Sequence, residues 1–344
     1  MQCAVDRLEE DSGLLNHLGR IGLVVNQSSV TSSYRQTVSI VFKAVKSLTH
    51  SSLVAVFGPQ HGYGQTEQDN MKETADSFYT LPDGQEIPLY SLYSVTREPL
   101  KEQLEDVDTL VVDLQDIGCR VYTYMLTLAG CLRSAAKFGK KVVVLDRANP
   151  LGLSSFSHVY KRWSRVEGNL LDTKFMSFVG WYSIPMRHGL TMGELGRYFI
   201  ECDGLNVDYQ VIPVLNLTRA QDLSQFAHDS WAMPSPNIPT WKSSYFFPSF
   251  VALEGTNVSE GRGTTVPFEL IGAPWLHAKK CMEFISDHKH LISSSSNLDQ
   301  ILHMRLHSFR PTFNKHMGNV CSGIYFCKGQ EEHLNLFSLG MLFL

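Results

Sequence analysis

Four short apolar runs of this sequence, at 21–25, 53–57, 109–113 and 141–146, each end in polar side chains that could do chemistry. Amide, imidazole, carboxyl and guanidinium groups can transfer protons to a substrate or bind its hydroxyl, amide and carboxylate groups. Because the carboxyl ends of parallel strands meet at one edge of a sheet, we expect these side chains to form a single site. The residues are Asn26, Gln60, His61, Asp113, Asp116, Arg147 and Asn149.

The segment DLQDIGCRVYTY, at 113–124, holds residues suited to glycoside hydrolysis. That reaction needs a protonated carboxyl group at the leaving oxygen and a second group that attacks the sugar or activates water. Asp113 and Asp116 follow an apolar run directly and could supply these groups. Arg120 could lower the pKa of a neighbouring carboxyl group, bind an acidic substrate, or form a salt bridge to one of the aspartates. Tyr122 could bind sugar hydroxyl groups.

Other ligand classes fit less well. Neither GxGxxG nor a P-loop follows the first apolar run, so we do not expect a dinucleotide or a P-loop phosphate site. His61, Asp69 and Asp113 could bind a metal ion, but HExxH and CxxC spacings are absent, and an organic polar ligand ranks above a metal. We therefore expect no metal and no cofactor.

Composition limits the partners and the compartment. Of the 344 residues, 43% are hydrophobic, and the formal net charge of -4 argues against nucleic acid as a partner. No apolar run approaches the ~20 residues that cross a bilayer, and the start, MQCAVDRLEEDSGLL, is acidic where a signal peptide would be basic. Seven cysteines without CxxC spacing indicate reduced thiols. We expect a cytoplasmic protein that binds no membrane; its oligomeric state stays open.

The alternation of apolar runs and helical patterns predicts an α/β fold. With a further strand at 209–214, it predicts a Rossmann-like, doubly wound parallel sheet. We expect this domain to span 15–222, and a smaller α/β (α+β) domain to span 223–344 and to be truncated. Helices are expected at 33–47, 96–106, 121–139, 191–202, 276–290 and 297–307, and a strand at 322–327.

Two further segments carry polar side chains. PMRHGLTMGEL holds Arg187 and His188, and the spacing of Thr191 and Glu194 predicts a helix-capping box. Arg-His-Gly also occurs in histidine acid phosphatases, but LTMGEL lacks the further arginine that those enzymes need. The glycine-rich segment, defined here as 254–269 (EGTNVSEGRGTTVPFE), could reach an anionic ligand through an arginine set between glycines. Its polar residues include Glu254, Asn257, Glu260 and Arg262.

Seven motifs in order along the chain resemble the exo-β-N-acetylmuramidase family called NamZ, or DUF1343. They are FGPQHG, PLYSLY, DLQDIGCRVYTY, VVLDRANPLG, SFVGWYSIPMRHGLTMGEL, PSPN and EGTNVSEGRGTTVPFELIGAPW. The resemblance implies a Rossmann-like catalytic domain, a smaller α/β domain, and a hydrolase of cell-wall peptidoglycan recycling. Such an enzyme releases N-acetylmuramic acid from the non-reducing ends of peptidoglycan fragments. The lactyl carboxylate of that sugar would explain Arg120, Arg147, Arg187 or Arg262.

The sequence departs from the family at the expected catalytic acid. The family reads Pro-Glu-His-Gly, whereas this chain has Gln60 in place of the glutamate, and an amide has no proton to donate at neutral pH. Glu67 and Asp69 follow closely as replacements. The segment 153–168 is also longer than in the family, and the apolar end, HLNLFSLGMLFL, stops short of the family's usual end.

These observations favour a glycosidase that acts on a small amino sugar or muropeptide. One alternative is a non-catalytic homologue that binds such sugars, and another is a phosphohydrolase that uses His188. The expected catalytic residues are Gln60, His61, Asp69, Asp113 and Asp116. The expected substrate-binding residues are Asn26, Asn70, Arg120, Tyr122, Arg147, Asn149, Arg187, His188, Glu254, Asn257, Glu260 and Arg262.

Overall fold

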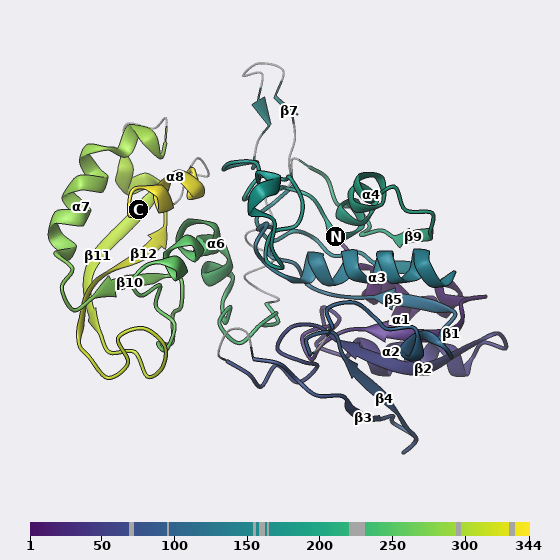
Figure 1. Cartoon of the computed structure of the whole chain (residues 1–344). Helices are drawn as coiled ribbons and strands as arrows, with labels where there is room; N and C mark the ends of the chain where they lie inside the picture. The colour runs from purple at the N-terminus through teal and green to yellow at the C-terminus, as the bar shows by residue number, and fades with distance from the viewer. Residues whose placement is uncertain are drawn as a thin grey trace. The chain divides into compact units, whose positions relative to one another are not determined.

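The computed structural model describes two compact units (Figure 1). The first comprises Met1–Arg165, Leu171–Ser183 and Gly189–Pro236, and the second comprises Val166–Leu170, Ile184–His188 and Asn237–Leu344. The boundary expected between 222 and 223 lies outside the described residues. Those are 1–68, 72–94, 96–153, 156–157, 162–163, 165–219, 231–293, 297–329 and 334–344.

The first unit is built on a seven-stranded sheet with the order β3-β4-β2-β1-β5-β6-β9. Every neighbouring pair is parallel except β3 and β4, which are antiparallel. Counted along the chain without β3, the strand order is 3-2-1-4-5-6, which is the doubly wound Rossmann order, so the predicted fold is confirmed. The strands are β1 (Gly19–Val24), β2 (Ser51–Gly58), β3 (Ser77–Thr80), β4 (Glu86–Ser91), β5 (Thr109–Val112), β6 (Lys141–Leu145) and β9 (Asp208–Ile212).

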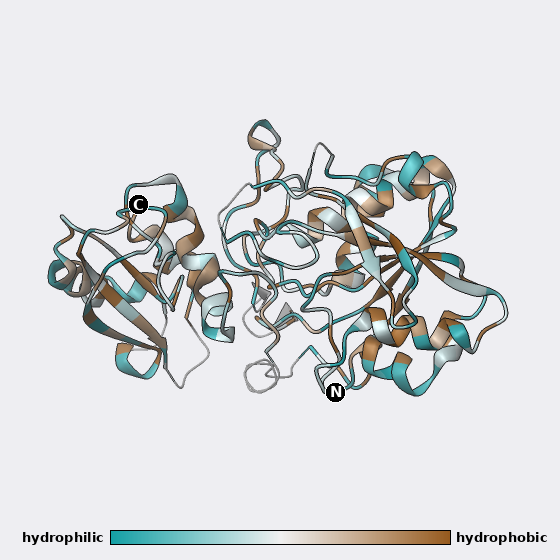
Figure 2. Ribbon diagram, turned by 90° about the horizontal axis from the view of Figure 1, so that it is seen from below, coloured by the Kyte–Doolittle hydropathy of each residue, from teal (hydrophilic) through white to brown (hydrophobic). Residues whose placement is uncertain are grey.

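Helices cover both faces of this sheet, which explains why its central strands are almost entirely apolar. All four residues of β5 and the last four of β1 and β6 are buried. Figure 2 shows these hydrophobic strands between helices on either side. The helices are α1 (Ala4–Glu10), α2 (Thr37–Lys46), α3 (Tyr124–Phe138) and α4 (Met192–Asp203).

The helices predicted at 33–47, 121–139 and 191–202 are confirmed; the first two are shorter than predicted, and the third is displaced by one residue. Helix α4 begins with the predicted capping box. Thr191 Oγ1 accepts a hydrogen bond from the Glu194 N–H (3.2 Å), and the Glu194 carboxylate accepts one from the Thr191 N–H (3.0 Å). Because all these partners lie within four residues, the cap can be predicted from sequence alone.

The exposed helix predicted at 96–106 is wrong, and only the 3-10 turn η2 (Glu102–Leu104) forms there. Thr96 Oγ1 accepts a hydrogen bond from the Glu98 N–H (3.0 Å) and donates one to the Glu98 carbonyl (2.6 Å). Such local bonds compete with helical hydrogen bonds, and Pro99 disfavours the helical backbone conformation of Glu98, which precedes it.

In its described residues, the second unit combines a three-stranded antiparallel sheet with three helices. The sheet has the order β10-β12-β11, with β10 (Leu270–Ala273), β11 (Leu302–Phe309) and β12 (Cys321–Lys328). The helices are α6 (Trp241–Phe250), α7 (Ala278–Asp287) and α8 (Leu336–Met341). The apolar end of the chain packs into this unit, where the Phe343 ring lies 5.9 Å from Phe250 and 6.1 Å from Phe326.

The helix predicted at 297–307 is wrong, because these residues form the 3-10 turn η6 (Leu298–Gln300) and most of β11. Leu302, Met304 and Leu306 alternate with polar residues, and pairing with β12 along the whole strand decides the conformation. The strand predicted at 322–327 is confirmed as part of β12.

The remaining short elements are η1 (Ser12–Leu15), β7 (Phe156–Ser157), β8 (Arg162–Trp163), η3 (Thr173–Phe175), η4 (Val251–Gly255) and η5 (Lys289–Leu291). Strands β7 and β8 pair antiparallel inside the long segment 153–168. Among the described residues, no helix is long and apolar enough to cross a membrane.

Candidate active site

The structure places four groups of predicted residues at the carboxyl ends of four neighbouring strands of the first unit. In sheet order these strands are β2, β1, β5 and β6. Between β1 and β5 the chain reverses the direction in which it adds strands, and this is the position where doubly wound sheets bind ligands. We call this edge the strand-end site. Its predicted members are Gln60 and His61 after β2, Asn26 after β1, Asp113 and Asp116 after β5, and Arg147 and Asn149 after β6.

Gln60 is buried and held at both ends of its amide group. Its Oε1 accepts a hydrogen bond from Thr123 Oγ1 (2.6 Å), and its Nε2 donates one to the Tyr93 hydroxyl (3.3 Å). Thr123 directly precedes α3, and Tyr93 follows β4, so three separate elements fix this one side chain. Sequence reasoning missed Tyr93 and Thr123, although both lie within the family-like motifs PLYSLY and DLQDIGCRVYTY.

His61 sits in a tight loop that turns back on itself after β2. The Gly62 N–H donates to the Pro59 carbonyl (2.9 Å), and His61 adopts the left-handed backbone conformation with φ of 70°. Non-glycine residues adopt this conformation at a cost, often at functional sites. His61 Nδ1 lies 2.7 Å from the Glu67 carbonyl oxygen, which can only accept, so Nδ1 carries the proton. Nε2 is then the basic nitrogen of the neutral ring.

Asp113 and Arg147 form a buried ion pair between the ends of β5 and β6. Asp113 Oδ1 accepts from Arg147 Nε (2.5 Å), and Oδ2 accepts from Arg147 Nη2 (2.9 Å) and from Thr37 Oγ1 (2.5 Å). Arg147 Nη2 also donates to the Val30 carbonyl (2.8 Å). Burial alone would lower the pKa of Arg147, but the Asp113 carboxylate outweighs it and raises that pKa. With both oxygens engaged, Asp113 is better suited to holding the strand ends together than to proton transfer.

Asp116 and Asn149 shape the loops after β5 and β6. Asp116 Oδ2 accepts a hydrogen bond from the Gly118 N–H (2.6 Å). Gly118 has a φ of 78°, and a Cβ atom there would lie 2.3 Å from Asn149 Oδ1, so only glycine fits. Asn149 donates to the Leu190 carbonyl (3.0 Å) and accepts from the Leu151 N–H (2.9 Å). Asn149 therefore positions backbone, while Asp116 is a buried carboxyl group at the strand-end site.

Arg120 and Tyr122 are both buried beside this loop. Burial lowers the pKa of Arg120, the opposite direction to the shift of Arg147. Burial also raises the pKa of Tyr122, whose ring meets that of Tyr124 edge-on at 4.9 Å. A buried guanidinium group contributes most to binding when it pairs with an anion such as a carboxylate.

Asn26 binds the protein itself. Its Nδ2 donates to the Tyr124 hydroxyl (2.7 Å) and to the Pro234 carbonyl (3.3 Å). Tyr124 and Gln65 donate to the same carbonyl. Three side chains from distant positions therefore hold the PSPN motif, and Asn26 has a structural part in the site.

No catalytic or binding role was predicted for Asp146, the first residue after β6. Its Oδ1 accepts from the Gly193 N–H (2.9 Å) and the Arg147 N–H (3.1 Å), which ties it to the start of α4. Burial nevertheless raises its pKa to about 6. Together with Thr191 and Arg197, Asp146 lines a pocket of about 250 Å³.

In the second unit, Arg187 is held by Glu167. Arg187 Nη1 donates to Glu167 Oε1 (2.5 Å), and Glu167 Oε2 accepts from the N–H groups of Leu336 (2.7 Å) and Phe337 (3.3 Å) at the start of α8. His188, the next residue, is buried. The Arg187–Glu167 pair therefore anchors the terminal helix of this unit.

The glycine-rich segment, also in the second unit, forms a small network of ion pairs. Arg262 Nη2 donates to Glu254 Oε1 (2.6 Å), and its Nε lies 3.3 Å from Glu260 Oε1. Lys315 Nζ donates to Glu260 Oε2 (2.9 Å) and to two backbone carbonyls. The Asn257 carbonyl lies 2.6 Å from His316 Nε2. Lys315 was missed because it lies far along the chain, outside the glycine-rich segment.

Two predicted site residues, Asp69 and Asn70, lie outside the described residues. Within the part of the chain that the structure describes, no group of three or more His, Cys, Asp or Glu residues is placed to hold a metal ion.

Two family models and one curated relative match nearly the whole chain. Residues 21–242 match the family model "Exo-beta-N-acetylmuramidase NamZ, N-terminal", and residues 245–344 match its C-terminal counterpart. Peptidoglycan beta-N-acetylmuramidase NamZ of Bacillus subtilis (strain 168) is 36% identical over 324 residues, which cover 94% of this chain and 72% of that protein.

Two solved structures, both of DUF1343 family proteins from Bacteroides fragilis NCTC 9343, have the same fold. One superposes with a TM-score of 0.80 at 28% identity, covering 98% of this chain and 80% of the other. The second has a TM-score of 0.66 at 26% identity, with coverage of 94% and 76%.

Proposed function

Because this chain belongs to the exo-β-N-acetylmuramidase NamZ family, we propose that it is a glycosidase that releases N-acetylmuramic acid from the non-reducing ends of peptidoglycan fragments. The substrate is a small amino sugar or muropeptide. The observation that carries this proposal is the match of both halves of the chain to the two family models, over 21–242 and 245–344. The convergence of polar loops at the strand-end site supports it.

Gln60 stands where the family has its expected catalytic glutamate, and its contacts suit a binding role. An amide nitrogen carries two hydrogens, and one is donated to Tyr93. We assign the other to a sugar oxygen or to the attacking water. Thr123 donates to Oε1, and in this orientation the amide nitrogen lies on the side of Tyr93.

Proton transfer falls to other groups in this proposal. His61 Nε2 is the basic nitrogen of a ring that the Glu67 carbonyl orients, and it acts as the base. Asp116 is the general acid that protonates the leaving oxygen, because both carboxylate oxygens of Asp113 are hydrogen-bonded to Arg147. Arg120, which is buried beside the Asp116 loop, binds the lactyl carboxylate of the sugar, because a guanidinium group can pair with both oxygens of a carboxylate.

The test is release of N-acetylmuramic acid from a chromogenic β-linked N-acetylmuramide and from the disaccharide N-acetylmuramic acid–N-acetylglucosamine. Wild type, Gln60→Glu, His61→Ala and Asp116→Asn are compared across pH. Gln210→Glu is the matched control, because it makes the same change at an exposed position on β9. We expect wild-type turnover, its loss in His61→Ala and Asp116→Asn by at least about 100-fold, and no change in Gln210→Glu.

The Gln60→Glu variant separates catalysis from binding alone. A carboxylate at this position would accept hydrogen bonds from both Thr123 and Tyr93, so the variant should fold. If wild type binds the sugar without cleaving it and Gln60→Glu restores cleavage, the chain is a binding homologue. If neither form cleaves or binds the sugar, the proposed function is wrong.

A further inference from the structure

Strand β11 of the second unit is a sheet edge with an unusual distribution of side chains. It pairs only with β12 among the described strands, so half of the backbone N–H and C=O groups of its eight residues point away from the sheet. One face of the strand carries His303, Arg305 and His307, and the buried Phe309 at its end. The other carries Leu302, Met304, Leu306 and Ser308.

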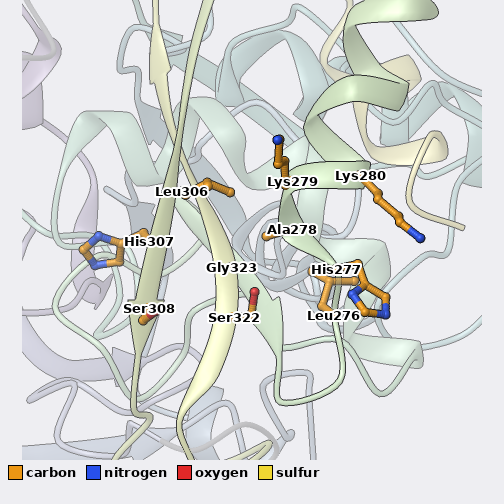
Figure 3. A pocket seen from close by; sticks show the side chains of 10 residues that line it. All are labelled: Leu276, His277, Ala278, Lys279, Lys280, Leu306, His307, Ser308, Ser322 and Gly323. Atoms are coloured by element: carbon orange, nitrogen blue, oxygen red, sulfur yellow. The ribbon is translucent and has the colours of Figure 1, made fainter.

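The apolar face of β11 borders a groove of about 440 Å³ beside the first turn of α7. Leu306, which is 54% exposed, faces this groove together with Leu276 and Ala278. Figure 3 shows Leu306 on the side of β11 toward α7 and His307 on the opposite side of the strand. Lys279 and Lys280 extend from the first turn of α7, His307 also borders the groove, and none of the described residues that line it is acidic.

The basic face of β11 is held in place by the neighbouring strand. Arg305 pairs across the sheet with Tyr325, and its guanidinium group lies 5.0 Å from the centre of that ring. The ring of His307 lies 6.0 Å from the same tyrosine. An ordered guanidinium group loses less conformational entropy when it binds a carboxylate than a mobile one does.

The charges on β11 determine what can occupy the edge. If a second copy of β11 paired antiparallel about Arg305, the two guanidinium groups would lie directly opposite each other, and like charges in that position destabilise a sheet. An added strand with acidic residues on the face of His303, Arg305 and His307 avoids this repulsion and pairs with the guanidinium group. On the groove face it must carry apolar residues to cover Leu306.

We propose that the β11 edge and the adjoining groove bind an extended acidic segment of a protein partner, which adds to the sheet as a fourth strand. Main-chain hydrogen bonds to β11 supply affinity, and the two faces of the strand select a segment in which acidic and apolar residues alternate. This interaction surface lies wholly within the second unit and does not depend on glycosidase activity.

The test uses the full chain and fluorescent peptides of about ten residues, with binding followed by fluorescence anisotropy. The probe alternates glutamate and valine, and matched peptides alternate lysine and valine or contain the same glutamates and valines in two blocks. We expect the alternating acidic peptide to bind at least about tenfold more tightly than either, and to weaken as salt rises from about 50 to 500 mM.

Backbone pairing is tested without altering the protein. N-methylation of alternate amides that would face β11 should abolish binding, whereas N-methylation of the other alternate set should preserve it. Arg305→Glu should weaken binding at least about tenfold, and Arg305→Gln less, while Lys43→Glu on the exposed face of α2 should change nothing.

Three results would overturn the proposal. The first is equal binding of the alternating and block peptides, which would show attraction by charge alone. The second is equal tolerance of both N-methylated sets, which would exclude strand addition. The third is absence of binding by the alternating acidic peptide while circular dichroism shows the protein to be folded.

Discussion

The strand-end site of the first unit and the glycine-rich segment of the second both gather charged residues, but they are assembled differently. At the strand-end site, Asp113 accepts hydrogen bonds from Thr37 and Arg147, which lie 76 and 34 positions away in the sequence. In the glycine-rich segment, Arg262 pairs with Glu254, only 8 positions away. The first arrangement exists only when the sheet has formed, whereas much of the second is local.

Burial separates the two regions further. The Asp113 side chain is fully buried and that of Arg147 is 9% exposed, whereas Glu254 is 33% exposed. Water screens the charges of an exposed ion pair. A buried charge that loses its partner has neither water nor another charge to stabilise it. Loss of the Asp113 charge should therefore destabilise the protein much more than loss of the Glu254 charge, although Arg262 and Glu260 of the glycine-rich segment are themselves buried.

The largest expected effect is that of Asp113→Asn. The change leaves the Arg147 charge buried without its carboxylate, and we expect the free energy of unfolding to fall by about 3–5 kcal/mol. Urea denaturation followed by circular dichroism measures it. As a control, the double variant Asp113→Leu with Arg147→Met should recover much of the loss. Wild-type stability combined with lost hydrolysis would instead assign Asp113 to catalysis.

A second prediction contrasts Asp113 with Asp146, a buried strand-end aspartate whose pKa is raised to about 6. The folded state binds the proton of Asp146 more tightly than the unfolded state, whose pKa is near 3.8, so this carboxyl group reduces stability as pH rises from 3.8 to about 6. Asp146→Asn should match wild type near pH 4 and exceed its stability at pH 8 by at most about 3 kcal/mol.

Denaturation curves of both forms at several pH values check this expectation. The amide side chain in Asp146→Asn would keep an oxygen that can accept from the Gly193 N–H, so the start of α4 should be preserved. A variant that is less stable than wild type at pH 8 would show that the Asp146 charge itself stabilises α4.

Thr123→Val gives an intermediate effect that concerns Gln60. The change preserves the shape of the side chain but removes the donor to Gln60 Oε1, which is left buried without that bond. We expect a loss of about 1–3 kcal/mol in the free energy of unfolding and weaker sugar binding by calorimetry. Tyr93→Phe, which removes the longer bond to Gln60 Nε2, should cost less. The reverse order would mean that Tyr93 is the main support of Gln60.

The smallest expected effect is that of Glu254→Gln in the glycine-rich segment. Because Glu254 is partly exposed and Arg262 keeps its contact with Glu260, we expect a change below about 1 kcal/mol. The same denaturation experiment checks it beside Asp113→Asn. A cost equal to that of Asp113→Asn would remove the proposed difference between the two regions.

The fold could be predicted where the deciding forces are local. Apolar runs such as 109–113 predict strands because a strand covered on both faces must be apolar throughout. Thr191 and Glu194 predict a helix start because the whole capping box lies within four residues. For the same reason, Thr96 and Pro99 show why 96–106 is not helical, although the prediction took the proline and the charge pattern as signs of an exposed helix.

The tertiary structure decided which residues form hydrogen bonds and ion pairs with one another. The sequence placed Asp113, Asp116 and Arg120 at one strand end and left open which of them form a salt bridge; the structure pairs Asp113 with Arg147 from the next strand of the sheet. Likewise, only the packing of α3 and the end of β4 against the loop after β2 brings Thr123 and Tyr93 to Gln60.

By itself, then, the sequence determined the doubly wound class of the sheet, the capped start of α4 and the strand ends that carry polar groups, because these follow from neighbours along the chain. Only the tertiary structure decided that 302–309 is a strand and that Gln60 is fixed by two hydroxyl groups. The physical reason is that a hydrogen bond or a strand pairing depends on which distant segment the fold brings into contact, and local periodicity carries no information about that segment.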